Sequence, residues 1–128
     1  MIDINKAKEA FDNYTSKYIK YGDKTNLKRK HSLYVAKISR YIAKNINLSD
    51  SDIKLAEIIG LLHDIGRFEQ LKKYNSFEDY STEGHADLGV KILFKQGCIR
   101  KFFKTDIYDK IILKAIENHN KFSIESNL

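Results

Sequence analysis

The sequence predicts an all-α protein, folded as one compact bundle of about five to seven helices in a single domain over residues 1–128. Apolar residues recur at steps of three and four along nearly the whole chain, and no run alternates convincingly as a strand would. The sequence has no proline and only six glycines, so little in its composition interrupts helices. A length of 128 residues and a hydrophobic share of 42% are typical of a soluble domain.

Two helices are expected in the first part of the chain. The first covers about residues 3–20, and a Tyr-Gly-Asp stretch ends it because glycine and aspartate favour turns. Its apolar stripe comprises Ile4, Ala7, Phe11, Tyr14 and Tyr18. The second covers about residues 26–46, with an inward face of Leu27, His31, Tyr34, Val35, Ile38, Ile42 and Ala43. His31 is therefore expected to point into the protein.

The third expected helix is the most apolar and should lie at the centre of the bundle. Ser49 stands three residues before Asp52, which resembles a capping box at a helix start. The segment 53–62 is apolar on nearly every side, as in a buried helix. It runs into His63-Asp64, and Gly66 is expected to cap its C-terminus.

Shorter elements are predicted in the second half of the chain. A short helix over about 67–73 leads into a polar loop over 74–84, and a helix over about 85–96 stops at Gly97. The inward residues of that helix are expected to be Ala86, Val90 and Leu93. After a turn over about 98–104, the last helix covers about 106–119. Its expected inward face is Tyr108, Ile112, Ala115, Ile116 and His119.

The formal net charge is +6, which is compatible with an anionic partner. The lysines are spread along every expected helix, and the one dense basic cluster is Lys28-Arg29-Lys30. This spread favours a small anionic substrate over a nucleic acid. Binding of nucleic acid through the cluster stays an alternative, and it would show a steep dependence on salt.

The cysteine count and the start of the chain predict a cytoplasmic protein. Cys98 is the single cysteine, which excludes a disulfide within the chain and a zinc site built on a Cys-X-X-Cys pair. We interpret it as a small buried apolar residue. The first residues are charged where a signal peptide is apolar, and no apolar run approaches the length of about 18 residues that spans a membrane.

The strongest chemical feature is the pair His63-Asp64 at the end of an otherwise apolar helix. A buried carboxylate needs a cation, hydrogen-bond donors or open water, because its burial without a partner is very unfavourable. The pair alone could also serve only to cap the helix and to form hydrogen bonds there.

The other histidines change this balance. The sequence has four histidines in all, and each stands on a separate expected element. His31 and His119 fall on apolar stripes, and His85 opens a helix after the polar loop. Convergence on one site explains this pattern better than four unrelated core residues. Neutral imidazoles and a carboxylate suit Zn, Fe, Mn, Co or Ni, and one carboxylate can bridge two such ions.

The order of these residues resembles the HD-domain superfamily of metal-dependent phosphohydrolases. The resemblance rests on His31, then Leu61-Leu62-His63-Asp64-Ile65-Gly66-Arg67, then Gly84-His85-Ala86-Asp87-Leu88-Gly89, then Ala115-Ile116-Glu117-Asn118-His119-Asn120. It covers the chain from about residue 25 to the end and is specific at the level of the superfamily. It says little about the substrate.

The resemblance implies a role for each residue. His31 would be the first ligand of the principal metal, and His63 with Asp64 would form the signature pair. His85 and His119 match the histidines of members that hold a second metal, in which the aspartate of the pair bridges the two ions. The implied reaction is hydrolysis of a phosphomonoester or nucleotide, with metal-bound hydroxide as the nucleophile.

The end of the chain departs from the family's motif, which closes with an aspartate on a later helix. No aspartate follows His119, and the one carboxylate there, Glu125, is too close to it to stand on a further core helix. We therefore expect a truncated domain whose principal metal is one ligand short. Core surface would then be left uncovered, and a homodimer would hide it.

Two further features could serve the reaction. Arg67 directly follows the signature pair, and its guanidinium could bind a substrate phosphate or form an ordinary surface ion pair. The loop 74–84 lies between two elements that carry ligands, and it could close over substrate or remain a solvated connector.

The leading hypothesis is therefore a phosphohydrolase with one or two divalent metal ions, acting on a phosphorylated small molecule or nucleotide. Asp64 and Arg67 are its predicted catalytic residues, and His31, His63, Asp64, His85 and His119 are its predicted metal ligands. The alternatives are a non-catalytic module that binds metal or a ligand, a nucleic-acid-binding protein, and a di-iron oxygenase.

Overall fold

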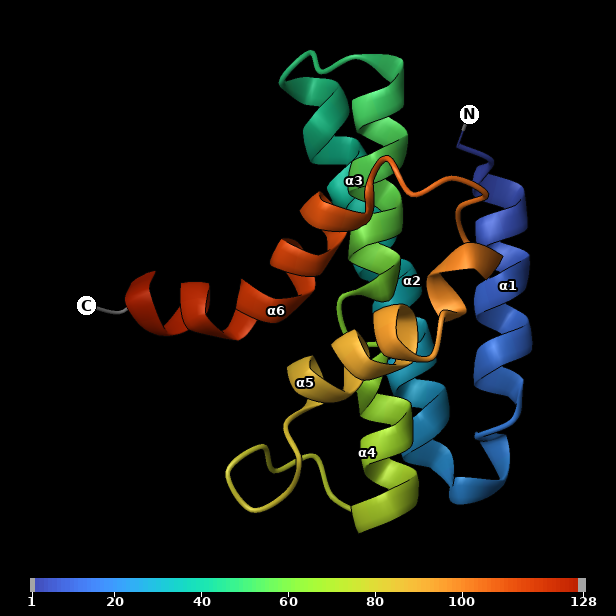
Figure 1. The fold of residues 1–128 in the computed structure, drawn as a ribbon, viewed down its shortest axis with the longest axis vertical. Coiled ribbons are helices and arrows are strands. Elements are labelled where there is room, and N and C mark those ends of the chain that lie inside the picture. The colour runs from blue at the N-terminus through green and yellow to red at the C-terminus, as the bar shows by residue number, and fades with distance from the viewer. Residues whose placement is uncertain (1, 127–128) are drawn as a thin grey trace.

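The structure, a computed structural model, describes the backbone of residues 2–126 and the side chains of residues 2–118 (Figure 1). Helices and tight helical turns account for the regular structure within these residues, which confirms the predicted all-α class. The order is α1 (Ile4–Ser16), η1 (Ile19–Tyr21), α2 (Asp23–Asn45), α3 (Asp50–Leu62), α4 (Gly66–Tyr74), α5 (His85–Val90), η2 (Lys91–Lys95), η3 (Cys98–Lys101) and α6 (Asp109–Ser126).

α1 and α3 form much of the core, as the sequence predicts. Phe11 and Tyr14 of α1 are buried, and the ring of Phe11 packs edge-on against that of Phe68 in α4. Ser49 caps α3, because its hydroxyl accepts a hydrogen bond from the backbone N–H of Asp52. Beyond this capped first turn, α3 buries Leu55, Ile58, Leu61 and Leu62, as expected of a central helix.

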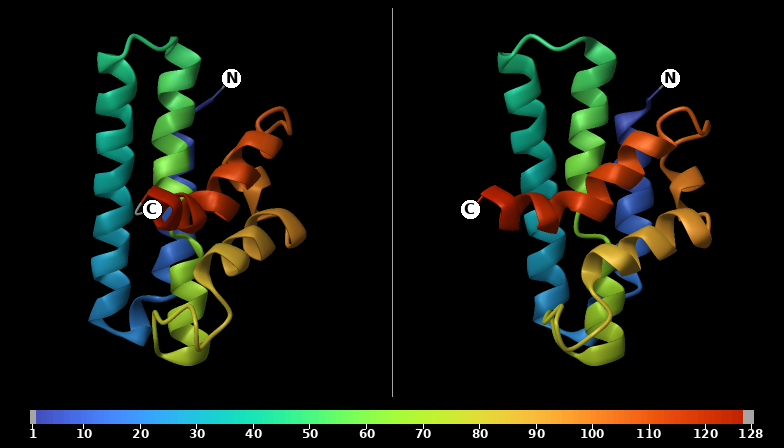
Figure 2. Two further views of the ribbon diagram at one scale, coloured as in Figure 1. Left: turned by 90° about the vertical axis from the view of Figure 1, so that its left-hand side faces the viewer. Right: turned by 60° about the vertical axis from the view of Figure 1, so that its left-hand side comes forward.

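α2 and α3 run side by side in opposite directions, joined by a short turn (Figure 2). Their close approach depends on Gly60 of α3, where a Cβ atom would lie 2.7 Å from the Ser39 hydroxyl and 3.1 Å from the Ala36 Cα. This contact lies one turn before His63. It therefore sets how near His63, which directly follows α3, comes to His31 of α2.

The predicted inward face of α2 is wrong for most of its residues, although Ala43 is buried as predicted. The residues that it buries are small, namely Thr25, Ser32, Ala36 and Ala43. Large apolar side chains of the predicted stripe are exposed instead, among them Leu27, Tyr34, Ile38 and Ile42. Two helices can pack closely only through small side chains, so the periodicity of large residues marks the wrong side. The predicted homodimer, which would hide core surface left uncovered after the last helix, stays a prediction, and sedimentation at micromolar concentration would decide it.

The predicted C-cap at Gly66 is also wrong. Residues 63–65 form a tight turn in right-handed helical geometry, and Gly66 is the first residue of α4. Its backbone lies against α5, where a Cβ atom would lie 1.9 Å from the carbonyl oxygen of His85 and 2.7 Å from the backbone nitrogen of Gly89. Gly66 therefore brings Asp64 and His85 together, which is a packing role.

The remaining elements follow the prediction with shifted bounds, but of the residues predicted to point inward over 85–96 only Leu93 is buried. Ala86 and Val90 are half-buried, and Leu88 and Ile92 are buried instead. α5 begins at His85, and the backbone of Gly97 has a φ of +79°, which ends that helical segment. α6 begins at Asp109, later than expected, and buries Ile112 and Ile116. His119 lies on α6, but its side chain is outside the described residues. Cys98 is partly buried, as expected of a small apolar residue. None of the helices within the described residues combines the length and apolarity that a bilayer crossing requires.

Replacing Gly66 with alanine should destabilise the protein by about 3 kcal/mol, because the new methyl group would force α4 away from the α5 backbone. The measurement is chemical unfolding of Gly66→Ala beside Gly84→Ala. Gly84 is the matched control, since its nearest neighbour would lie 3.9 Å from the added Cβ atom. Equal stabilities of the two variants would contradict the packing role of Gly66.

Candidate metal centre

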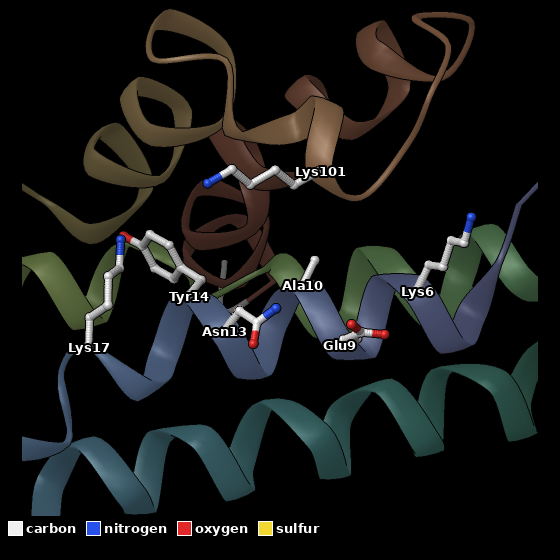
Figure 3. A pocket seen from close by; sticks show the side chains of 7 residues that line it. All are labelled: Lys6, Glu9, Ala10, Asn13, Tyr14, Lys17 and Lys101. Carbon is white, nitrogen blue, oxygen red and sulfur yellow. The ribbon is translucent and has the colours of Figure 1, made fainter.

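The predicted ligands do not lie in the pocket beside α1. One pocket of about 540 Å³ lies between α1 and η3 (Figure 3). Its lining residues are Lys6, Glu9, Ala10, Asn13, Tyr14, Lys17 and Lys101. None of them is a predicted ligand. The predicted ligands whose side chains the structure describes, His31, His63, Asp64 and His85, meet instead around the turn between α3 and α4.

Asp64, whose side chain is only 7% exposed, stands at the middle of this meeting point. Its Oδ2 atom lies 3.3 Å from His63 Nε2 and 3.7 Å from His31 Nε2. Its Oδ1 atom lies 3.3 Å from His85 Nε2. Oδ2 therefore faces two imidazoles, and Oδ1 faces a third. This is the arrangement that a carboxylate between two metal ions would need.

The main-chain contact of His63 sets the direction of its ring. His63 Nδ1 donates a hydrogen bond to the carbonyl oxygen of Gly60 at 2.6 Å. A carbonyl can only accept, so the proton stands on Nδ1 and the opposite nitrogen, Nε2, turns toward Asp64. Such fixing of the ring by its second nitrogen is usual for histidines that bind metals.

His31 reaches the centre from α2, at its rim. Its side chain is 47% exposed, which corrects the prediction that it points into the protein. Its ring centre lies 5.5 Å from that of His63. Among the described residues, His31, His63 and Asp64 form a group that could hold a metal ion, with one ligand atom from each lying within 4.8 Å of the others. An open position at the rim is what a substrate needs to reach an ion.

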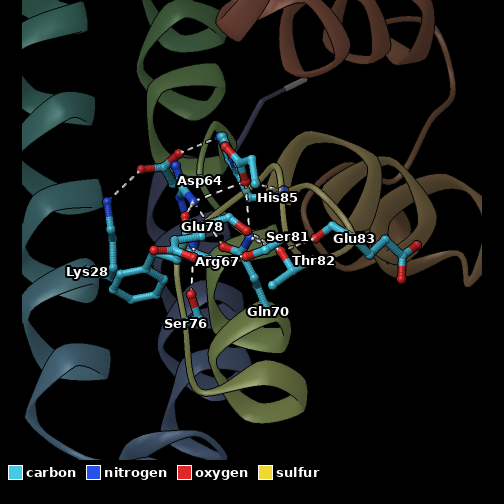
Figure 4. A network of polar contacts seen from close by, with 12 residues as sticks. Lys28, Asp64, Arg67, Gln70, Ser76, Glu78, Ser81, Thr82, Glu83 and His85 are labelled. Atoms are coloured by element: carbon cyan, nitrogen blue, oxygen red, sulfur yellow. Dashed lines mark hydrogen bonds and ion pairs between the residues drawn. The ribbon is translucent and has the colours of Figure 1, made fainter.

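His85 reaches the centre from the start of α5 and is almost fully buried. Its Nδ1 atom lies 3.0 Å from both carboxylate oxygens of Asp79, and its backbone N–H donates to Asp79 Oδ1 at 3.0 Å. Asp79 therefore holds the proton of His85 on Nδ1, and the Nε2 atom turns to Asp64. Figure 4 shows how Asp64 and His85 approach each other.

Asp79 is in turn held by two residues of α4. Gln70 Nε2 donates to Asp79 Oδ1 at 3.0 Å and to the Thr82 hydroxyl at 2.9 Å. Arg67 Nη1 donates to the Phe77 carbonyl at 2.7 Å and contacts Asp79 at 3.2 Å. These contacts tie the inner side of the loop to α4 (Figure 4). The predicted binding of substrate phosphate by Arg67 stays a prediction, since this nitrogen already has protein acceptors.

The sequence pattern misses Asp79 and Gln70 because neither is unusual among the polar residues around it. The one available feature was a carboxylate six residues before a candidate histidine. The sequence also gives no sign that Lys28, predicted only as part of a basic cluster, lies at the metal centre. Its Nζ atom lies 3.3 Å from Asp64 Oδ2, and Arg29 pairs with Asp12 of α1, so the basic cluster does not form one surface patch.

Burial and neighbouring charges set the protonation of the centre. Burial by itself would raise the pKa of Asp64, but His63 and Lys28 hold it well below its usual range. Burial is the main cause that lowers the pKa of His31 and of His85. Burial also acts to lower the pKa of His63, but pairing with Asp64 outweighs it and raises that pKa. At neutral pH the centre thus offers a carboxylate and two neutral imidazoles, the forms that bind metals.

Comparison with known proteins identifies the family of the chain. Residues 29–127 match the HD domain family, so most of the chain is covered and the chain belongs to this family. HD domains bind divalent metals, and the family is one of metal-dependent phosphohydrolases. No curated protein and no solved structure matches the chain significantly.

Metal affinity should rise with pH between about pH 6 and pH 8, because the raised pKa of His63 means that a proton competes with the metal for its ring. Calorimetric titration with Mn²⁺ in buffers of different ionisation enthalpy would measure the affinity and the proton released. An affinity that stays flat over this range would contradict His63 as a ligand.

Replacing Asp79 with alanine should weaken metal binding by roughly tenfold to a hundredfold, because His85 would lose the partner that orients its ring. The matched control is Glu78→Gln, since the Glu78 carboxylate accepts from the Ser81 hydroxyl and does not contact His85 in the described structure. Titration with Mn²⁺ measures both variants. Equal affinities in Asp79→Ala and the wild type would show that His85 needs no such support.

Proposed function

We propose that this chain is a phosphohydrolase that uses one or two divalent metal ions to cleave a phosphorylated small molecule or nucleotide. The observation that supports this function best is that the two oxygens of the Asp64 carboxylate face different histidines. Oδ2 faces His31 and His63, and Oδ1 faces His85. Membership of the HD domain family adds independent support.

The donor set fits divalent transition metals. Imidazole nitrogens and a carboxylate are ligands that Mn, Fe, Co, Ni and Zn accept. His31, His63 and Asp64 would hold one ion, and Asp64 with His85 would contribute to a second. His119 stays a predicted ligand of the second ion. When bound, the ions would lower the pKa of a coordinated water and offset charge on the phosphoryl oxygens.

The residues of the chain would supply the rest of the mechanism. Asp64, kept ionised by its cationic neighbours, would orient the groups that it bridges. Gly60 and Asp79 hold the rings of His63 and His85, so these ligands need little reorganisation before reaction. The exposed edge of His31 would leave the substrate an approach from the surface.

Metal content tests this proposal directly. The wild-type chain, incubated with Mn²⁺ and desalted, should retain two ions by elemental analysis and should hydrolyse p-nitrophenyl phosphate. His31→Ala and His85→Ala should each lose one ion, because each histidine serves a different oxygen of Asp64. Asp64→Ala should lose both, with turnover falling by roughly 10³-fold or more.

The matched control is Asp87→Ala, which removes an exposed carboxylate from the same helix as His85. It should keep two ions and full turnover. Metal-dependent turnover that survives in Asp64→Ala would refute the assigned centre.

One observation favours a second candidate, a non-catalytic module. The Lys28 ammonium already provides Asp64 Oδ2 with a cationic partner at 3.3 Å. If that ion pair is permanent, the chain would bind no metal at Oδ2. Retention of no Mn²⁺ by the wild-type chain would favour this module over the hydrolase.

A further inference from the structure

A small pocket opens beside the candidate metal centre. It has a volume of about 240 Å³, and its lining residues are Lys24, Leu27, Lys28, His31 and Phe77. It therefore shares His31 with the group that could hold a metal ion. A molecule seated in it would lie directly beside that group.

The pocket offers two kinds of chemistry. Lys24 and Lys28 stand four residues apart on α2, so they lie on the same side of the helix. They give one part of the wall a positive charge. Leu27 and the ring of Phe77 form an apolar part. A ligand that matches both parts carries an anionic group joined to a compact apolar group.

Lys28 connects the pocket to the centre. Its Nζ atom lies 3.3 Å from Asp64 Oδ2 and 5.5 Å from the centre of the Phe77 ring. Oδ2 is also the oxygen that faces His31 and His63. A divalent ion at that oxygen and the Lys28 ammonium are therefore alternative cationic partners. When a divalent ion occupies Oδ2, the Lys28 ammonium loses Asp64 as its partner. Because Lys28 already lines the pocket, an anion there can replace Asp64 as that partner.

Phe77 contacts α2 and α4 through its ring and its main chain. Its carbonyl oxygen accepts a hydrogen bond from Arg67 Nη1 at 2.7 Å. Its ring also has the Arg67 guanidinium 5.7 Å from its centre, in addition to Lys28. These contacts place the Phe77 ring beside the two cations, in the apolar wall of the pocket.

We propose that this pocket binds the leaving group of the substrate and that Lys28 binds an oxygen of its phosphoryl group. This inference rests on the proposed function and narrows its substrate to phosphate monoesters with a compact apolar or single-ring leaving group. A volume of about 240 Å³ supports this size, because pockets that enclose drug-sized ligands hold roughly 300–1,000 Å³. Lys24 adds charge at the rim.

The first test measures metal affinity. Lys28→Met keeps most of the side-chain stem and removes the charge. It should bind Mn²⁺ roughly threefold to fivefold more tightly than the wild type, because the competing ammonium is gone. Lys30→Met is the matched control, since Lys30 is an exposed lysine of the same helix, and it should leave the affinity unchanged.

The second test measures ligand binding without turnover. Phenylphosphonate and methylphosphonate are non-hydrolysable probes that differ only in the apolar group, and calorimetry with the Mn²⁺-saturated chain gives their affinities. Lys28→Met should weaken both probes by roughly tenfold, because a hydrogen bond to a charged group is lost. The wild type should bind phenylphosphonate more tightly than methylphosphonate. Phe77→Ala should remove this preference, and Phe77→Tyr should retain it. Tyr80→Ala is the control, since Tyr80 is an exposed aromatic residue of the same loop.

The outcomes separate this inference from the proposed function. A wild-type chain that neither retains Mn²⁺ nor turns over substrate would count against the hydrolase. Probe binding that is indifferent to Lys28 and Phe77, in a chain that retains metal, would overturn the subsite alone. Tighter Mn²⁺ binding by Lys28→Met with unchanged probe affinity would also overturn the phosphoryl role of Lys28.

Discussion

The carboxylate of Asp64 is buried where α2, α3 and α5 meet, and a buried charge is stable only with charged or hydrogen-bonding partners. Its partners within the described part of the chain include His31, His63, His85 and Lys28. Each comes from a helix or a turn whose position depends on close backbone packing. The contacts of the site are therefore those that stabilise the buried Asp64 carboxylate.

Two glycines permit these contacts. Gly60 lets α2 approach α3, and Gly66 lets the start of α4 lie against the start of α5. A side chain at either position would separate the elements that bring His31 and His85 to Asp64. The apolar core around Phe11 supplies stability, whereas the glycines decide which polar groups can meet.

The loop 75–84 joins the site through its inner side. Asp79 orients His85, Gln70 and Arg67 hold Asp79, and the carbonyl of Phe77 completes the attachment to α4. The loop thus does more than connect two helices. It supplies a positioning carboxylate and one apolar wall of the pocket beside His31.

Much of the fold could be predicted from the sequence, because helical periodicity, the Ser49 cap and the Gly97 stop are local features that act within a few residues. The HD motif is also a property of residue order. The buried side of α2 could not be predicted, since it is chosen by close contact with α3 and falls on small residues.

The sequence by itself thus determined the helices and the candidate ligands, because each is encoded by nearby residue types. Only the tertiary structure decided which atoms meet. Asp79, Lys28 and Gly66 acquire their roles from neighbours that are distant along the chain or across a loop. Distances between such groups depend on how whole helices pack, and no local pattern records them.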